Sequence, residues 1–213
     1  FACRPSHKRR AEAQDDDVMI EEVETTNRAE VIFFGGGNAY KMKVSDIPDG
    51  KASQLGEYIP NLVGMEEKAD IIGMVLANDY SGNLLFVFDN GKCAKVPLSA
   101  YATKSNRRRL TGAYSAKAEA IAMFFLPEDT DILLISSAEK ALCVNTEKIP
   151  LKTTRTTQGV GVMTLRRGAV IKAAYLAENS GFAEPKRYRP RNIPAAGSAI
   201  KDEDKGIEQL SLF

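Results

Sequence analysis

The 213-residue sequence is poor in the side chains on which most catalytic and metal sites depend. It holds a single histidine, His7, no tryptophan, and three cysteines, Cys3, Cys93 and Cys143. It contains no C-x-x-C pair for zinc or redox chemistry, and no G-x-x-x-x-G-K-[ST] loop for nucleotide phosphates. We therefore expect no catalytic residue, no metal site and no cofactor in this chain. Cys93 and Cys143 are expected to be buried as small apolar side chains.

Long apolar runs are also missing. No stretch approaches the roughly 18 apolar residues that a membrane-spanning helix needs, and the first residues lack the apolar region of a signal peptide. Three scattered cysteines do not form the disulfide framework of a secreted domain. The sequence thus predicts a cytoplasmic protein without a membrane partner. Because the chain begins with Phe1 rather than methionine, we also expect it to be a fragment of a longer protein.

Charge is distributed unevenly along the chain. The net charge of +1 combines 29 basic and 28 acidic residues, but residues 1–80 hold 9 basic against 15 acidic residues. Residues 92–191 hold 18 basic against 8 acidic residues. A local excess of this size predicts a polyanionic partner. The alternative is a solvated surface of mixed charge.

A repeat of about 50 residues organises the chain. Three apolar runs each lead through a turn to a lysine-bearing segment and predict β-hairpins: 31–34, 84–88 and 132–135. Glycines at 35–37 and the sequence Asp89-Asn90-Gly91 are typical of tight hairpin turns. After each hairpin a second apolar run is expected to form another pair of strands: 71–76, 120–125 and 170–175. The pattern predicts an all-β, propeller-like array of about three to four four-stranded blades.

Composition divides the chain into three regions. Residues 1–24 are acidic and predict a linker from a preceding domain, and residues 25–182 contain the repeats. Residues 183–213 combine prolines with charges of both signs and predict a flexible tail. Within that tail the acidic residues Asp202-Glu203-Asp204 are expected to be solvated.

Basic residues gather in the loops that follow the second and third hairpins. Equivalent loops of stacked blades lie along one rim, so these side chains could contact successive phosphates of double-stranded DNA with little sequence preference. Glycines in such a loop would let backbone N–H groups approach phosphates. The predicted contacts are Lys104, Arg107, Arg108, Arg109, Lys152, Arg155, Gln158, Gly159, Gly161, Arg166 and Arg167. The alternative is a set of ordinary solvated loops.

The repeat resembles a known family. Residues 89–101, DNGKCAKVPLSAY, are similar to the repeat unit of the C-terminal domain of the A subunit of bacterial DNA gyrase and topoisomerase IV, and residues 15–34 resemble the beginning of that domain. The resemblance extends over residues 18–180. It implies a β-pinwheel, a propeller variant that exchanges strands between blades and bends DNA around its basic rim.

The same resemblance implies a parent enzyme and its partners. The parent would be an ATP-hydrolysing type II topoisomerase of the nucleoid. This chain would work beside the ATPase B subunit, together with the remaining domains of the A subunit. The cleavage tyrosine and the metal-binding carboxylates of the family belong to preceding domains, so the chain would have no catalytic activity of its own.

One family motif is missing. Gyrase-type domains carry a basic box of the form Q-R-R-G-G-K-G in the first blade. The nearest match here, Gln158-Gly159-Val160-Gly161, lies in the third repeat and lacks the arginines. The resemblance therefore implies a topoisomerase IV-like domain, or a degenerate gyrase domain, that bends and orients DNA rather than wrapping it strongly.

The C-terminal pentapeptide Gln209-Leu210-Ser211-Leu212-Phe213 resembles the motif by which bacterial proteins dock on the replication sliding clamp. It supports an alternative function, a protein-interaction propeller tethered to a replication partner through Gln209, Leu210, Leu212 and Phe213. A further alternative is that the apolar side chains of this segment fold back over the open end of the array.

Overall fold

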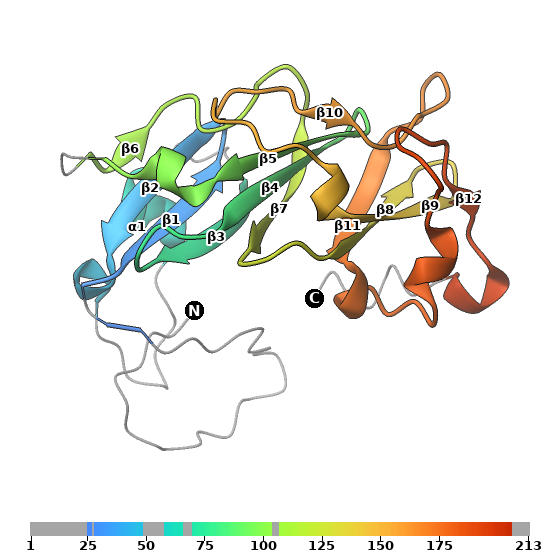
Figure 1. The fold of residues 1–213 in the computed structure, drawn as a ribbon. Coiled ribbons are helices and arrows are strands. Elements are labelled where there is room, and N and C mark those ends of the chain that lie inside the picture. Colours follow the sequence, from blue (N-terminus) through green and yellow to red (C-terminus); the bar gives the residue numbers. More distant parts are fainter. Residues whose placement is uncertain (1–24, 27, 49–57, 66–69, 104–106, 206–213) are drawn as a thin grey trace.

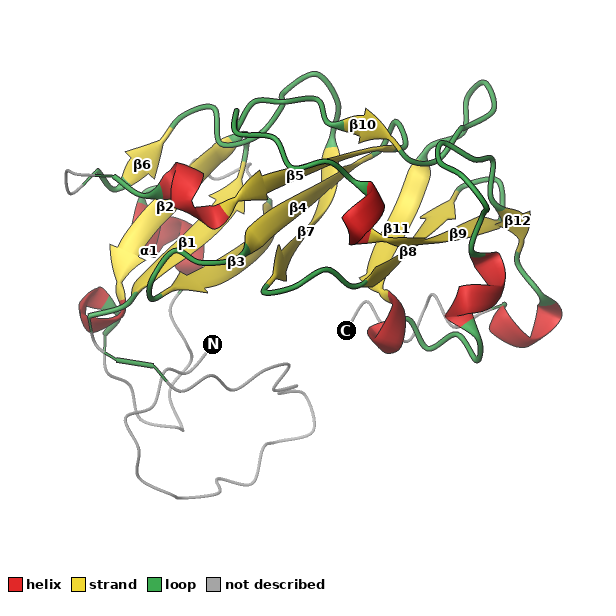
Figure 2. Cartoon of the chain, viewed as in Figure 1, coloured by secondary structure: helices red, strands yellow, loops and turns green. Residues whose placement is uncertain are grey.

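The computed structural model describes residues 25–26, 28–48, 58–65, 70–103 and 107–205. These residues form three four-stranded antiparallel sheets, which follow one another in a row and which we call blades 1, 2 and 3 (Figure 1). Short 3-10 helices and one five-residue α-helix connect the strands within this described part (Figure 2). The all-β expectation is confirmed.

Each blade has two long hairpin strands in its middle and a very short strand at one edge. Blade 1 has the order β3 (Ile71–Ala77), β1 (Glu30–Gly35), β2 (Asn38–Lys43) and β6 (Arg109–Leu110). Blade 2 has the order β7 (Ala120–Leu126), β4 (Asn83–Phe88), β5 (Lys92–Pro97) and β10 (Val160–Gly161). Blade 3 has the order β11 (Ile171–Leu176), β8 (Asp131–Ser136), β9 (Lys140–Asn145) and β12 (Ser198–Ala199).

The helical elements are short connections. The α-helix is α1 (Ile59–Val63). The 3-10 helices are η1 (Val44–Asp46), η2 (Leu98–Tyr101), η3 (Thr146–Lys148), η4 (Ala177–Asn179), η5 (Pro185–Tyr188) and η6 (Asp202–Asp204). None of the helices among the described residues is long and apolar enough to cross a membrane.

The short edge strands are exchanged between repeats. Strand β6 follows the second hairpin in sequence but pairs with β2 of blade 1, and β10 follows the third hairpin but pairs with β5 of blade 2. The prediction that each second apolar run forms a pair of strands is therefore wrong. Each run forms one strand, β3, β7 or β11, and the fourth strand of the blade comes from further along the chain.

Three segments of chain carry the short edge strands, and we call them crossing segments 1 (residues 102–103 and 107–119), 2 (149–170) and 3 (189–200). Segments 1 and 2 cross to the edge of the preceding blade, whereas segment 3 adds β12 to β9 of its own blade 3. Each is held by a hairpin turn. The carbonyl groups of Gly37, Gly91 and Glu139 accept hydrogen bonds from Ala113, Val162 and Ile200, with N···O distances of 2.9, 2.9 and 3.1 Å. The three accepting residues all have positive φ, so the turn directs the same carbonyl outward in each blade.

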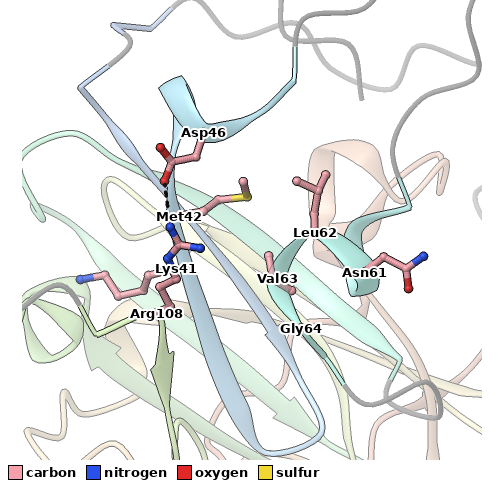
Figure 3. A pocket seen from close by; sticks show the side chains of 8 residues that line it. All are labelled: Lys41, Met42, Asp46, Asn61, Leu62, Val63, Gly64 and Arg108. Atoms are coloured by element: carbon pink, nitrogen blue, oxygen red, sulfur yellow. Dashed lines mark ion pairs between the residues drawn. The ribbon is translucent and has the colours of Figure 1, made fainter.

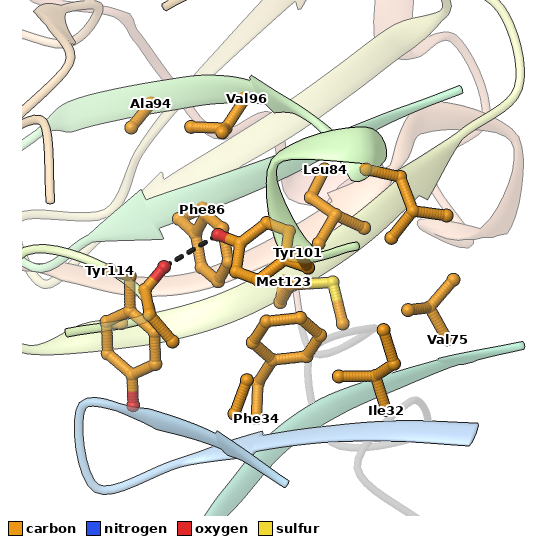
Figure 4. Close-up of a cluster of buried hydrophobic side chains, with 14 of the residues drawn as sticks. Ile32, Phe34, Val75, Leu84, Phe86, Ala94, Val96, Tyr101, Tyr114 and Met123 are labelled. Atoms are coloured by element: carbon orange, nitrogen blue, oxygen red, sulfur yellow. Dashed lines mark hydrogen bonds between the residues drawn. The ribbon is translucent and has the colours of Figure 1, made fainter. Parts of the chain in front are cut away.

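The central strands are apolar on both faces because each blade packs between two layers. Ile32 and Phe34 of β1 face Leu84 and Phe86 of β4 in the core between blades 1 and 2 (Figure 4). The ring of Phe34 packs edge-on against Phe86 and Tyr101, with centroid distances of 5.6 and 5.2 Å. A second core between blades 2 and 3 contains Cys93, and Cys143 lies in a third core on the outer face of blade 3. Both cysteines are fully buried, as expected.

Both ends of the array are covered. Helix α1 and Met65 pack on the outer face of blade 1. On blade 3, Phe182, Tyr188 and Ile200 pack against strands β8 and β9. Residues 183–205 thus differ from the flexible tail expected from their composition, because aromatic and apolar side chains anchor them. The domain limits themselves stay a prediction.

The acidic residues at the end of the described chain are not uniformly solvated. Asp204 is 1% exposed, and its carboxylate accepts hydrogen bonds from the Tyr188 hydroxyl and from the backbone N–H of Ala183. The expectation of a solvated triad is wrong for Asp204. Asp202 and Glu203 are exposed.

Candidate nucleic-acid interface

Crossing segment 1 carries three consecutive arginines. Arg107, Arg108 and Arg109 are exposed, and Arg109 begins β6, where it lies opposite Tyr40 of β2. The guanidinium of Arg109 lies 5.7 Å from the centroid of the Tyr40 ring. Lys104, the fourth cation predicted for this segment, lies outside the described residues.

Crossing segment 2 carries the remaining predicted contacts. Lys152 is exposed, and its backbone N–H donates to the Lys95 carbonyl at 2.8 Å. The Gln158 side chain accepts from Lys92 Nζ at 3.5 Å. Arg166 and Arg167 are exposed in a tight turn, in which the Ala169 N–H donates to the Arg166 carbonyl at 3.0 Å.

Arg155 is held over a buried ring. Its guanidinium lies 5.8 Å from the centroid of the Tyr101 ring, which is fully buried beneath it. Burial raises the pKa of Tyr101, although the nearby charge of Arg155 acts in the opposite direction. A guanidinium that lies over an aromatic ring still has its N–H donors, which point outward in its own plane, free to bind an anion.

Glycine at 159 has a packing reason. Gly159 has a φ of +69°, and a Cβ built there would lie 2.0 Å from the Cys93 carbonyl oxygen. Its N–H donates to Thr157 Oγ1 at 3.2 Å within the loop. Gly161 lies in β10 opposite Lys92. Close contact with β5 therefore explains Gly159 without a ligand, and the DNA contact of the two glycines stays a prediction.

The cations of the crossing segments are largely without carboxylate partners. In the described part of the chain, Arg107, Lys152, Arg166 and Arg167 form no ion pair within 4.0 Å. Arg108 lies 3.8 Å from the Asp46 carboxylate, but its side chain is 80% exposed, so solvent screens that pair strongly.

Three cations that cover blade 3 are different, because acidic side chains pair with them. Arg187 pairs with Glu184 at 3.1 Å and also with Glu203. Lys205 pairs with Asp202 at 2.7 Å, and Arg189 pairs with Asp131. Lys186, Arg191 and Lys201 are also exposed there and form no ion pair within 4.0 Å among the described residues, so crossing segments 1 and 2 carry a large share, but not all, of the positive charge available to a partner.

Crossing segment 2 contains no acidic residue, and its four basic residues are Lys152, Arg155, Arg166 and Arg167. Strands β6 and β10, which belong to crossing segments 1 and 2, lie along the same side of the row of blades in Figure 1. A row of unneutralised cations on adjacent blade edges creates a positive potential that attracts a polyanion.

A shallow pocket of about 350 Å³ lies beside Arg108 (Figure 3). Met42 of β2 and Leu62 and Val63 of α1 form its apolar wall, and the Asp46–Arg108 pair lies at its edge. Within the described residues, no three His, Cys, Asp or Glu side chains form a group that could hold a metal ion. The predicted partner-binding residues Gln209, Leu210, Leu212 and Phe213 lie outside the described residues.

No family model matches the chain. In sequence it is similar to the DNA gyrase A subunit of Lawsonia intracellularis, with 24% identity over 127 residues. It is also similar to the DNA gyrase A subunit of Campylobacter jejuni, with 30% identity over 90 residues. These matches cover 59% and 40% of this chain but only 16% and 10% of the two gyrase proteins.

Three solved structures share the fold. The C-terminal domain of DNA topoisomerase IV has a TM-score of 0.67 and 24% identity, and the match covers 77% of this chain and 52% of that one. The E. coli ParC C-terminal domain has a TM-score of 0.62 and 14% identity, covering 84% and 80%. The DNA gyrase A C-terminal domain has a TM-score of 0.55 and 16% identity, covering 82% and 60%. The chain has the β-pinwheel fold of these C-terminal domains. The family resemblance expected from the repeat is confirmed.

In this β-pinwheel, sequence reasoning missed two residues that hold the crossing segments. Lys41 and Lys95 are each the fourth residue of the second hairpin strand, and they are 4% and 5% exposed. Their recurrence at the same place in two repeats was the available signal. Lysine is rarely buried, so the sequence pattern alone favours a solvated side chain.

Proposed function

We propose that this chain is the DNA-binding C-terminal domain of the A subunit of a type IIA topoisomerase. In this function crossing segments 1 and 2 contact the phosphates of duplex DNA. The chain supplies no catalytic group, and the parent protein, working with an ATPase B subunit, carries out ATP-dependent strand passage. A cytoplasmic, nucleoid-associated location follows from this proposal.

The observation that carries the proposal is the acid-free crossing segment 2. Its exposed Lys152, Arg166 and Arg167 have no carboxylate partner among the described residues, whereas Arg187, Arg189 and Lys205 on blade 3 all have one. Binding to DNA is favoured when unpaired cations displace counterions from the phosphates. The crossing segments, which carry such cations, are therefore the surface that we expect to bind DNA.

We propose that the DNA bends. Phosphate contacts on the edges of successive blades guide the duplex from one blade to the next, and the bend costs energy that these contacts repay. The first blade lacks the basic glycine-rich box of gyrase-type domains, which supports a topoisomerase IV-like role in bending and orienting DNA rather than strong wrapping.

Two charge-matched triple variants test the binding surface. The first replaces Lys152, Arg166 and Arg167 with glutamine, and the second replaces the paired cations Arg187, Arg189 and Lys205 with glutamine. At about 0.1 M salt, the first variant should bind a duplex of about 40 base pairs on the order of tenfold or more weakly. The second should bind within about twofold of the unaltered chain. Equal losses in both variants would contradict the assignment of the surface.

Bending is tested separately by energy transfer between dyes at the two ends of the same duplex. Saturating the duplex with the unaltered chain should raise the transfer efficiency, because the ends approach one another. Binding without any change in transfer would contradict bending while leaving the DNA-binding function intact.

A second candidate function concerns the C-terminal pentapeptide. The match of residues 209–213 to the clamp-docking pattern at every position supports a sliding-clamp partner. Deleting these five residues should abolish capture by an immobilised bacterial sliding clamp without changing the affinity for DNA. Clamp binding that persists after the deletion would contradict this candidate.

A further inference from the structure

Two lysines are buried where solvated side chains would be expected. Lys41 in β2 and Lys95 in β5 occupy the same strand position and are 4% and 5% exposed. Burying an ammonium group is costly unless it is paired and hydrogen-bonded. The partners of both lysines therefore show what the burial achieves.

Lys41 holds crossing segment 1 at two places. Its Nζ lies 3.1 Å from the Glu30 carboxylate and also donates to the Tyr101 carbonyl at 3.4 Å and to Thr103 Oγ1 at 3.2 Å, where the segment begins. Its backbone N–H donates to the Arg108 carbonyl at 2.7 Å. One residue thus fixes the chain before the arginine cluster and at Arg108 within it, and Lys41 and Arg108 are drawn together in Figure 3.

Lys95 holds crossing segment 2 in a similar way. Its Nζ lies 2.8 Å from the Asp129 carboxylate and donates to the Thr146 carbonyl at 2.8 Å, just before the segment. Its own carbonyl accepts the Lys152 N–H at 2.8 Å. The side chain of Lys95 therefore ties β5 to Thr146, just before the segment, and its backbone carbonyl ties β5 to Lys152.

The third blade has no such lysine. Cys143 occupies the equivalent position in β9, and the carboxylate at this boundary, Asp131, is instead paired with Arg189. Residues 192–200 of crossing segment 3, which include β12, carry no charge. Crossing segment 3 as a whole carries two cations, Arg189, which is paired with Asp131, and Arg191. A buried lysine is thus present at the two blade edges whose crossing segments carry at least three exposed cations, and absent at the third.

We propose that Lys41 and Lys95 are positioning residues for DNA binding, which hold the backbone of crossing segments 1 and 2 in the arrangement that meets phosphates. This inference rests on the proposed function. Neither side chain touches DNA, because both ammonium groups are enclosed by protein partners. Their effect is on the free protein: a segment that is already ordered loses less conformational entropy when DNA binds.

A positioning residue and a contact residue leave different signatures in the salt dependence of binding. Replacing a phosphate-contacting cation lowers the slope of log K against log salt by about one. Replacing a buried lysine removes no phosphate contact, so the slope should stay the same while the affinity falls at every salt concentration.

The test is Lys41→Met in the full chain, because methionine fills a similar volume and the Glu30 carboxylate, which is 31% exposed, keeps contact with solvent and with the Tyr80 hydroxyl. We expect DNA affinity to fall about three- to tenfold with an unchanged salt slope. Backbone amides of residues 107–113 should exchange hydrogen faster in the free variant than in the unaltered chain. Lys95→Met should give the same signature, with faster exchange around residues 152–158.

Lys43→Met is the matched control, since Lys43 lies on the same strand and is exposed. It should leave affinity and exchange in crossing segment 1 unchanged. Unchanged affinity in both buried-lysine variants, or a salt slope lowered by about one, would overturn the proposal. Failure of the unaltered chain to bind duplex DNA would overturn the proposed function instead. The exchange measurement would then still decide whether Lys41 orders the segment, and unchanged exchange would overturn that as well.

Discussion

Burial separates the basic residues of this domain into two kinds. Arg107, Arg166 and Arg167 are exposed and have no ion-pair partner in the described part of the chain, so their charge is available to an anion. Lys41 and Lys95 are enclosed and fully engaged, so their charge is used within the protein. Residue type alone does not distinguish a cation proposed to contact DNA from one that holds the protein chain in place.

The carboxylates that pair with the buried lysines make stability depend on pH. Hydrogen bonds from Lys95 and Thr146 lower the pKa of Asp129 below its ordinary value of 3.8. Burial alone would raise the pKa of Glu30, but hydrogen bonds from Tyr80 and Lys41 outweigh it and lower the pKa below 4.5. A carboxylate with a lowered pKa stabilises the fold above its unfolded-state pKa, and this contribution is lost as the pH falls through the folded-state pKa.

We therefore predict that the contribution of Glu30 and Asp129 to the free energy of unfolding is the same at about pH 7 and pH 5. At about pH 3 this contribution is smaller, so urea titrations of the unaltered chain should give a lower free energy of unfolding. The Lys95→Met variant should lose less between pH 5 and pH 3, because Asp129 no longer has its main stabilising partner. Parallel pH profiles for the two proteins would contradict this account of the pair.

The buried thiols should be unreactive. Burial raises the pKa of Cys93 to about 12, and burial is also the main cause that raises the pKa of Cys143. Because the thiolate is the reactive form, neither cysteine should react with a disulfide reagent in the folded protein at about pH 8. Both should react in denaturant, as followed by mass spectrometry of the labelled peptides. Rapid labelling of Cys93 in the folded chain would show that β5 is accessible.

At the scale of elements, the crossing segments complete the blades and also carry the cations proposed to contact DNA. Crossing segments 1 and 2 each begin after a hairpin, add a short strand to the preceding blade, and carry basic residues before or after that strand. The two-residue strands β6 and β10 therefore connect adjacent blades and also hold in place the segments that carry the predicted DNA contacts.

A substitution at Gly159 tests how closely crossing segment 2 packs against β5. An alanine at this position would have a φ of +69° and a Cβ 2.0 Å from the Cys93 carbonyl oxygen, so the second crossing segment would have to move from β5. We predict that Gly159→Ala lowers the free energy of unfolding by about 3 kcal/mol.

Gly168→Ala is the matched control, because its φ is +81° but a Cβ there meets nothing within 4 Å. Only the backbone cost of about 1 kcal/mol should appear in urea titrations of this variant. Equal losses in the two variants would mean that contact with β5 is not what requires glycine at 159.

Asp204 holds in place the segment that packs on blade 3 through Phe182 and Tyr188. Replacing it with alanine would leave the Tyr188 hydroxyl and the Ala183 N–H without their acceptor. We predict a loss of about 1 to 3 kcal/mol in the free energy of unfolding for Asp204→Ala. The exposed neighbour should matter less, and Asp202→Ala should change stability by less than about 0.5 kcal/mol. A neutral Asp204→Ala variant would show that the cover does not stabilise the domain.

At the scale of the whole molecule, the sequence predicts the long strands but not how they are completed. The runs at 31–34, 84–88 and 132–135 mark β1, β4 and β8 because strands buried on both faces are continuously apolar. Two-residue strands carry no periodic pattern, so β6 and β10 could not be recognised as edges of the preceding blades, nor β12 as the edge of blade 3. The candidate cations were recognisable as a group, but the order of residues 183–205 was not, because a few buried side chains anchor an otherwise polar segment.

The central claim is that crossing segments 1 and 2 form one surface for DNA phosphates. It is tested most directly by the affinity for a duplex of about 40 base pairs over a series of salt concentrations. The unaltered chain should give a log–log slope of magnitude about four to eight, and the triple glutamine variant at Lys152, Arg166 and Arg167 should lower it by about two to three. A slope near zero, or a slope that falls only when Arg187, Arg189 and Lys205 are replaced, would contradict the account.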